Sequence, residues 1–112
     1  MSPGSPIPPF SVLTHLSDGP VRVVVSGELD IETVPLLREA LDAAEYADGR
    51  GVILDLAAVS FIDSTGLQLL LSRKIAATAD APQLRIVASD VVRRLVDLAG
   101  VQHVIDLEAS GG

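Results

Sequence analysis

The sequence predicts an α/β fold in which helices pack on a mixed β-sheet, with the element order ββαβαβα and a short final element. Two observations predict this fold. Four short segments alternate apolar and polar residues or are rich in β-branched residues, whereas three longer segments carry apolar residues at helical spacing. From the second strand onward the two kinds of segment alternate, which is typical of strands joined by helical crossovers. The length of 112 residues fits one domain.

The first two strands are predicted to form a hairpin. Phe10–Leu16 alternates imperfectly with period two, and residues 17–20 (Ser-Asp-Gly-Pro) are a cluster of turn formers. Val21–Val25 then resumes with β-branched residues, and Gly27 is predicted to end the strand.

The first helix is predicted to begin after Thr33, which can cap it, with Pro35 in the first turn. Its apolar spacing continues to about Tyr46, and the Gly-containing residues 48–51 close it. Val52–Leu56 follows as a short strand that is almost entirely apolar. We therefore expect this strand to be covered on both faces, or nearly so.

The second helix is predicted to follow a turn at residues 62–66, with Ser64 as its N-cap. Its predicted buried stripe consists of Leu67, Leu70, Leu71 and Ile75. Leu69 falls on the opposite side of this helix, so we expect it to be exposed. Pro82 stops any continuation.

The last part of the chain predicts a strand, a helix and a short final element. Leu84–Ala88 alternates as a strand does, Ser89 can cap a helix that runs to Ala99, and Gly100 lies where a helix-ending glycine belongs. Residues 104–107 form a short strand or a turn of helix. We expect a disordered Pro-rich tail at residues 1–9, a domain at 10–108 and a second disordered tail at 109–112.

Composition excludes several classes of protein. The formal charge of −7 and the pI near 4.5 disfavour binding to nucleic acid or to an anionic membrane, and favour a basic protein partner. The absence of cysteine excludes thiolate metal sites and cysteine nucleophiles, and is compatible with the cytoplasm. No apolar stretch is long enough to span a bilayer, and residues 1–9 do not form a signal peptide.

The common catalytic and cofactor sites are also disfavoured. A serine hydrolase using Ser64 would need a small residue where Ile62 stands, and a histidine from the only two, His15 and His103. No phosphate-binding loop motif occurs. The carboxylates near predicted strand ends have no metal-ligand spacing, so we expect no metal and no cofactor; they are Asp30, Glu32, Asp55 and Asp63.

One segment remains in which polar residues precede a helix. Ser64 and Thr65 stand at the predicted helix start, directly after Asp63. In one interpretation Ser64 caps the helix, Asp63 complements its dipole and Gly66 permits packing. In the other, Ser64 is a phosphorylation site, because a helix N-terminus tolerates a dianion. The residues alone leave both interpretations open.

From Phe10 to Leu107 the sequence resembles a STAS domain, of the single-domain bacterial anti-sigma factor antagonist kind. Four segments carry the resemblance in order. The most specific is Phe-Ile-Asp-Ser-Thr-Gly-Leu at 61–67, which resembles the family's F-x-D-S-[ST]-G-L motif. The others are Gly-Glu-Leu-Asp at 27–30 followed by Thr33 and a helix, Val-Ile-Leu-Asp-Leu at 52–56, and Val-Arg-Arg-Leu at 92–95 with Ala-Gly-Val at 99–101.

The resemblance implies a binding protein that is not an enzyme. Such proteins bind an anti-sigma factor that is also a serine kinase, and so release the sigma factor. The kinase phosphorylates the serine that corresponds to Ser64, which weakens binding, and a serine phosphatase reverses the change. We expect a cytoplasmic monomer or weak dimer. The residues expected to face the partner are Asp30, Asp63, Thr65, Gly66, Gln68, Leu69 and Ser72.

Gln68 and Ser72 stand where many relatives have glycine, which bears on how closely a partner approaches.

Two alternatives remain beside this interpretation. The first alternative is a STAS accessory subunit of a lipid-transport ABC system, a binding module that is not phosphorylated. The second is a small serine hydrolase that uses Ser64.

Overall fold

The computed structural model describes residues 10–47, 51–77 and 83–109. The predicted tail at 1–9, the closing residues 48–50, Pro82 and residues 110–112 lie outside this part. The elements in chain order are β1 (Ser11–His15), β2 (Val21–Leu29), α1 (Val34–Ala47), β3 (Val52–Ile62), α2 (Ser64–Ala76), β4 (Leu84–Ala88), α3 (Asp90–Ala99) and β5 (Leu107–Ala109). The predicted order is confirmed, and the short final element is a strand.

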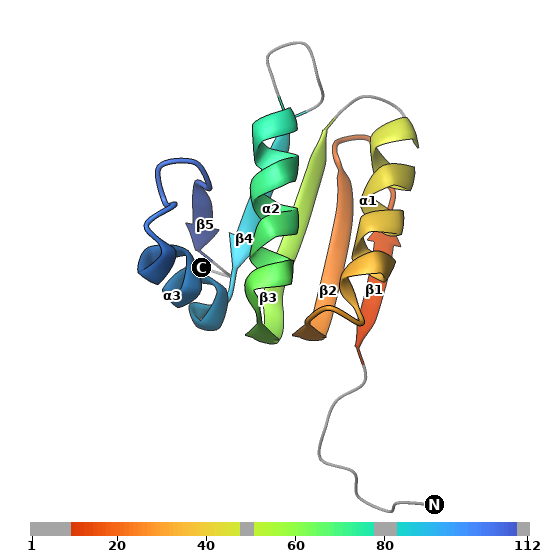
Figure 1. Cartoon of the computed structure of the whole chain (residues 1–112). Helices are drawn as coiled ribbons and strands as arrows, with labels where there is room; N and C mark the ends of the chain where they lie inside the picture. The colour runs from red at the N-terminus through yellow and green to blue at the C-terminus, as the bar shows by residue number, and fades with distance from the viewer. Residues whose placement is uncertain (1–9, 48–50, 78–82, 110–112) are drawn as a thin grey trace, which may run out of the picture.

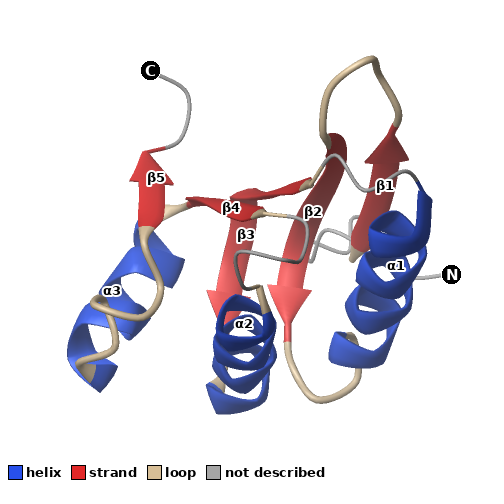
Figure 2. Ribbon diagram, turned by 90° about the horizontal axis from the view of Figure 1, so that it is seen from above, coloured by secondary structure: helices blue, strands red, loops and turns tan. Residues whose placement is uncertain are grey.

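The five strands form one mixed sheet in the order β1-β2-β3-β4-β5 (Figure 1). β1 pairs antiparallel with β2 as the predicted hairpin, and the other neighbours are parallel. Seen from above, the three helices lie on the same side of the sheet (Figure 2). Because β2 and β3 are parallel neighbours, their carboxyl ends lie side by side, and the turns that lead into α1 and α2 start from the same edge.

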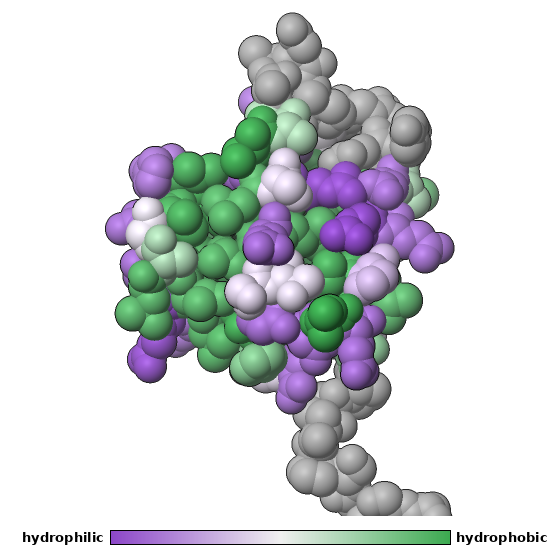
Figure 3. All heavy atoms as spheres, in the orientation of Figure 1, coloured by the Kyte–Doolittle hydropathy of each residue, from purple (hydrophilic) through white to green (hydrophobic). Residues whose placement is uncertain are grey.

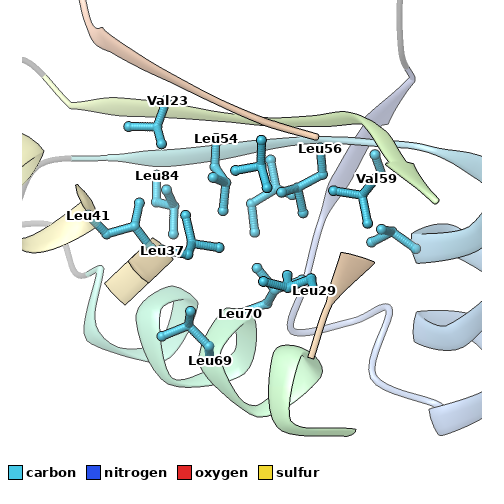
Figure 4. Packing of buried hydrophobic residues seen from close by; sticks show 14 of the residues in the cluster. Val23, Leu29, Leu37, Leu41, Leu54, Leu56, Val59, Leu69, Leu70 and Leu84 are labelled. Carbon is cyan, nitrogen blue, oxygen red and sulfur yellow. The ribbon is translucent and has the colours of Figure 1, made fainter. Parts of the chain in front are cut away.

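The core lies between the sheet and the helices and is aliphatic (Figure 4). Alternate residues of each strand point into it, because successive side chains of a strand face opposite sides of the sheet. In β2 these are Val21, Val23, Val25 and Leu29, all at most 1% exposed. Leu37 and Leu41 of α1 and Leu70 of α2 cover them from the helical side.

The other face of the sheet carries no helix in the described part of the chain, so the expectation that both faces of 52–56 are covered is wrong. Asp55 forms an ion pair with Arg22 there, and Arg85 forms one with Glu108 at 2.7 Å. The hydrogen bonds from Arg85 hold the pKa of Glu108 below its usual range. Cross-strand charge pairs therefore accompany half-buried apolar residues such as Ile53.

β2 and β3 are both longer than predicted. β2 continues through Gly27 to Leu29, and β3 has 11 residues and ends only at Ile62. The pairing of β2 with β3 shifts in register between Val24 and Ser26 and again between Gly27 and Glu28. These irregularities allow the two strands to stay paired to their ends. The extension matters for function because it carries both strands up to Asp30 and Asp63.

The two ends of α3 are confirmed as predicted. The Ser89 side chain caps the helix by accepting a hydrogen bond from the Val92 amide, and its hydroxyl donates to the Val59 carbonyl at 2.9 Å. Gly100 ends the helix in the left-handed conformation, with φ of 71°.

The buried face of α2 differs from the predicted stripe. Ile75 is 67% exposed and Leu71 is only half-buried, whereas Leu69 is 3% exposed. Successive residues are rotated by roughly 100° about the helix axis, and the centre of the buried face is formed by residues that lie within about 60° of one another around this axis. These residues, named here the inner line, are Gly66, Leu70, Arg73 and Ala77.

The composition of this line explains why the prediction failed. It contains a glycine, which has no side chain, and an arginine, so the large apolar residues of α2 are not centred on its buried face. Arg73 is accommodated because it pairs with Asp42 of α1. Leu69 lies on the flank of α2 beside α1, and Leu70 points at the sheet (Figure 4).

Candidate functional site

The turns after β2 and β3 meet at one edge of the sheet. Leu29 and Ile62 are partners in the register of the two strands, and the Asp63 amide donates a hydrogen bond to the Leu29 carbonyl at 3.2 Å. Asp30 and Asp63 therefore both lie at this edge, which we name the Ser64 edge. Ser64 directly follows Asp63 and therefore lies at the same edge.

Asp63 is the N-cap of α2. Its Oδ1 accepts a hydrogen bond from the Gly66 amide at 3.0 Å, and its backbone is extended, with φ of −106° and ψ of −175°. Its carbonyl accepts from the Leu67 amide at 3.0 Å. The prediction that Ser64 caps the helix is therefore wrong, since Ser64 is the first residue inside it.

Because Asp63 takes the capping role, the Ser64 hydroxyl is left available. Ser64 is exposed, and its side chain makes no hydrogen bond within the described part of the chain. The amides of a first helical turn have no partner within the helix, and the helix dipole is positive at this end. A phosphate on the Ser64 oxygen would therefore lie in water at a helix N-terminus, where negative charge is favoured.

Gly66 lets α2 approach the sheet closely. A Cβ at this position would lie 2.9 Å from Ile62 Cγ1, 3.1 Å from Leu29 Cγ and 3.2 Å from the Leu29 oxygen. Gly66 is buried, so it supports the Ser64 edge from below and offers no side chain to a partner.

Asp30 shapes the turn that leads into α1. Its Oδ1 accepts hydrogen bonds from the amides of Glu32 at 3.0 Å and Thr33 at 3.1 Å. The Thr33 hydroxyl donates to the Glu28 carbonyl at 2.8 Å and accepts from the Asp30 amide at 2.9 Å. Thr33 precedes the helix as predicted, but these bonds direct its hydroxyl back into the turn.

The structure exposes only some of the residues that the sequence assigns to a partner surface. Gln68 and Ser72 are exposed, Thr65 is half-buried, and the Ser72 hydroxyl donates to the Leu69 carbonyl at 2.9 Å. The expectation that Leu69 is accessible is wrong, because the flank of α2 that carries it packs beside α1.

The structure also shows exposed apolar residues near Ser64 that were not predicted from the sequence. Ile31, next to Asp30, is 69% exposed, and Phe61, two residues before Asp63, is 46% exposed. The exposure of Phe61 could have been predicted, because this residue alternates with the buried Ile62 at the end of β3. No such pattern predicts the exposure of the turn residue Ile31.

The arrangement does not supply a serine hydrolase. His15 lies opposite Arg22 near the amino end of β2, whereas Ser64 follows the carboxyl end of the neighbouring β3. A strand of nine residues separates these ends by roughly 25 Å. His103 lies beyond the far end of α3. Asp55, on the open face of the sheet, is likewise apart from Asp30 and Asp63.

Comparison with known proteins gives one family. The model of the STAS domain matches residues 12–111. The anti-sigma-B factor antagonist of Staphylococcus aureus (strain NCTC 8325 / PS 47) is 33% identical over 97 residues, which are 86% of this chain and 90% of that protein. The protein of the same name from Staphylococcus epidermidis is 36% identical over 97 residues, covering 86% and 88%.

Solved structures have the same fold. An anti-sigma factor antagonist from Mycobacterium paratuberculosis superposes with a TM-score of 0.76 and 30% identity, covering 98% of this chain and 90% of that one. The Bacillus cell fate determinant SpoIIAA in its phosphorylated form gives a TM-score of 0.63 at 23% identity, covering 91% and 93%. At that identity the likeness to SpoIIAA concerns the fold alone. Among the described helices, none is both long and apolar enough to cross a membrane.

Proposed function

The chain belongs to the STAS-domain family, and we propose that it is an anti-sigma factor antagonist whose binding is switched by phosphorylation of Ser64. It would bind an anti-sigma factor that is also a serine kinase, and so release the sigma factor. One observation carries the proposal: an exposed serine hydroxyl, free of the capping role, begins a helix at the Ser64 edge. The likeness to antagonists over 86% of the chain supports it.

The proposed partner surface surrounds Ser64. It includes Thr65 and Gln68, with Ser72 farther along α2 and Asp30 on the neighbouring turn. Asp63 helps to present the Ser64 hydroxyl, because it takes the cap and thereby holds the first helical turn in place. Neither aspartate is proposed as a general base, since the kinase supplies that group.

Phosphorylation is expected to weaken binding without unfolding the chain. The phosphate adds about −1.5 to −2 charge at pH 7. It joins an edge that is already acidic, because residues 27–37 and 59–72 contain no Lys or Arg and hold Glu28, Asp30, Glu32 and Asp63.

The kinase that modifies Ser64 itself contributes to the weakening of binding after phosphorylation. It must bring an ATP γ-phosphate and its own catalytic carboxylate to the Ser64 hydroxyl. After transfer, the new dianion faces that carboxylate and the phosphates of the ADP left behind, and like charges in an interface cost several kcal/mol. A serine phosphatase would restore the binding form. Since an anti-sigma factor acts where RNA polymerase is, the proposal places the chain in the cytoplasm.

The first test identifies the partner and then reconstitutes the reaction. The chain is used to capture proteins from its native host, and the captured anti-sigma factor is purified. With ATP and Mg²⁺ it should phosphorylate the chain stoichiometrically at Ser64. Ser64→Ala should abolish the phosphate and retain binding.

Two results would overturn the proposal. Capture of a transporter ATPase instead of an anti-sigma factor would favour the accessory subunit of a lipid-transport system. Phosphate mapped to Thr65, with Ser64 unmodified, would refute the assignment of the switch residue.

A further inference from the structure

Ser64 lies on an exposed line of α2 that continues as an apolar strip. At roughly 100° per residue, four residues of this helix fall within about 60° of one another, on the side opposite the inner line. We name them the outer line: Ser64, Gln68, Leu71 and Ile75. Ile75 is 67% exposed, whereas the predicted apolar contact, Leu69, is buried on the flank beside α1.

The outer line borders an apolar surface. Leu69 marks the flank of α2 that faces α1, so Leu71 lies toward the other flank, on the side of α3, and Ile75 faces outward. Figure 3 shows hydrophobic residues gathered on the surface between α2 and α3, whereas hydrophilic residues prevail on the α1 side. On α3, Leu95 is half-buried, whereas the 79% exposed Leu98 lies among charged residues of the same helix, Asp90, Arg93, Arg94 and Asp97. A single exposed leucine has no special meaning, but a gathering of apolar residues is typical of an interaction surface.

The two ends of this surface differ in charge. The end that carries Ser64 is acidic, with Glu28, Asp30, Glu32 and Asp63 and no basic residue in segments 27–37 and 59–72. The outer line itself carries no charge. A protein that fits here must therefore present apolar side chains along α2 and basic ones toward the turn between β2 and α1.

We propose that the anti-sigma factor docks along the whole outer line, with Leu71 and Ile75 as apolar contacts about two and three turns from the phosphorylated end. This inference rests on the proposed function and deepens it. The apolar contacts supply affinity, because buried apolar side chains dominate binding energy in most interfaces. Ser64, at the acidic end of the same line, supplies the switch. Leu69 makes no direct contact in this arrangement.

The absence of cysteine from the sequence makes a direct test possible. In Ile75→Cys the only thiol of the chain reports burial at that position, through its rate of alkylation by iodoacetamide followed by mass spectrometry of this chain. Leu13→Cys is the matched control, because Leu13 is 56% exposed on β1 at the open face of the sheet. Excess purified anti-sigma factor should slow alkylation several-fold at position 75 and leave position 13 unchanged.

A second measurement tests the energetic contribution. Ile75→Ser should weaken binding of the anti-sigma factor about tenfold or more, whereas Leu13→Ser should leave it within about twofold. The urea midpoints of both variants should match that of the wild type, since both side chains are exposed.

The outcomes separate this inference from the proposed function. Undiminished alkylation at position 75 in a complex that forms normally, or an unchanged affinity of Ile75→Ser, would overturn the docking line and leave the antagonist function standing. Failure of the wild-type chain to bind any anti-sigma factor would overturn both.

Discussion

Gly66 determines how closely α2 approaches the sheet. It is buried between Ile62 and Leu29, the last residues of β3 and β2, and the Asp63 side chain accepts a hydrogen bond from its amide. A single residue thus joins the helix cap to the strand ends. Its position in the Asp-Ser-Thr-Gly motif therefore has a structural reason beside the functional one at Ser64.

Gly66→Ala should destabilise the protein. A methyl group there would contact Ile62 Cγ1 at 2.9 Å and the Leu29 oxygen at 3.2 Å, which requires the helix to shift. Overpacking costs about 1–3 kcal/mol, and the better helix propensity of alanine returns about 1 kcal/mol. We expect a net loss of about 1 kcal/mol or more in urea unfolding.

Gly19→Ala is the control for this change, because its Cβ would meet only Ser17 Oγ at 3.9 Å. Gly66→Ala with a free energy of unfolding equal to that of Gly19→Ala would show that α2 has room to move.

Leu69 and Ile75 should behave in opposite ways. Leu69→Ala removes a side chain that is 3% exposed, so unfolding should lose about 2–5 kcal/mol, with unchanged partner affinity per folded molecule. Ile75→Ala should change stability by less than about 1 kcal/mol and weaken binding. Unfolding curves and titration with the anti-sigma factor separate the two effects. Loss of affinity in folded Leu69→Ala would restore Leu69 to the interface.

At the scale of elements, the Ser64 edge is built by two strand ends and two helix starts. Both turns use an aspartate in the same way: Asp30 accepts amide hydrogen bonds before α1, and Asp63 accepts one at the start of α2. The strands hold the turns together through the bond from Asp63 to Leu29. The geometry of Ser64 is therefore maintained by hydrogen bonds of the backbone and of these two carboxylates.

Two roles of Asp30 can be separated by mutation: its hydrogen bonds within the turn and its proposed contact with the partner. Asp30→Asn keeps an acceptor for the amides of Glu32 and Thr33 but removes the charge, so stability should change little while partner binding weakens. Asp30→Ala removes the acceptor too and should cost about 1 kcal/mol of stability. Thermal unfolding and affinity are measured for both. Unaltered binding and phosphorylation in Asp30→Asn would leave Asp30 with a structural role only.

The elements that were predictable are those with strong local signals. The hairpin, the third helix with Ser89 and Gly100 at its ends, and the strand 84–88 followed from turn residues, caps and alternation. The full lengths of β2 and β3 did not, because a bulge near Gly27 interrupts the pattern. The buried face of α2 was misplaced because its centre holds Gly66 and Arg73 instead of large apolar residues.

For the whole molecule, the motif at 61–67 located the candidate switch residue, but the chemistry around it required the fold. The sequence could not show that Asp63 caps α2 and leaves Ser64 free, or that Ile31 and Phe61 are exposed near it. These facts depend on which strand ends become neighbours. The open face of the sheet was missed for a similar reason, because Asp55 finds its partner, Arg22, on a strand 33 residues away.

The charge of the whole molecule bears on how the switch works. The chain has a formal charge of −7 at pH 7, and the Ser64 edge contributes four carboxylates to it. A phosphate placed on an exposed first-turn serine changes this charge without displacing any buried group. Phosphorylation should therefore act on affinity and leave stability nearly unchanged.

The most direct test compares the affinity of the purified anti-sigma factor for the chain before and after stoichiometric phosphorylation of Ser64. The phosphorylated chain should bind about a hundredfold more weakly or worse, which corresponds to a few kcal/mol, at an unchanged unfolding midpoint. Equal affinity of the two forms, with the phosphate verified on Ser64, would contradict the proposed switch.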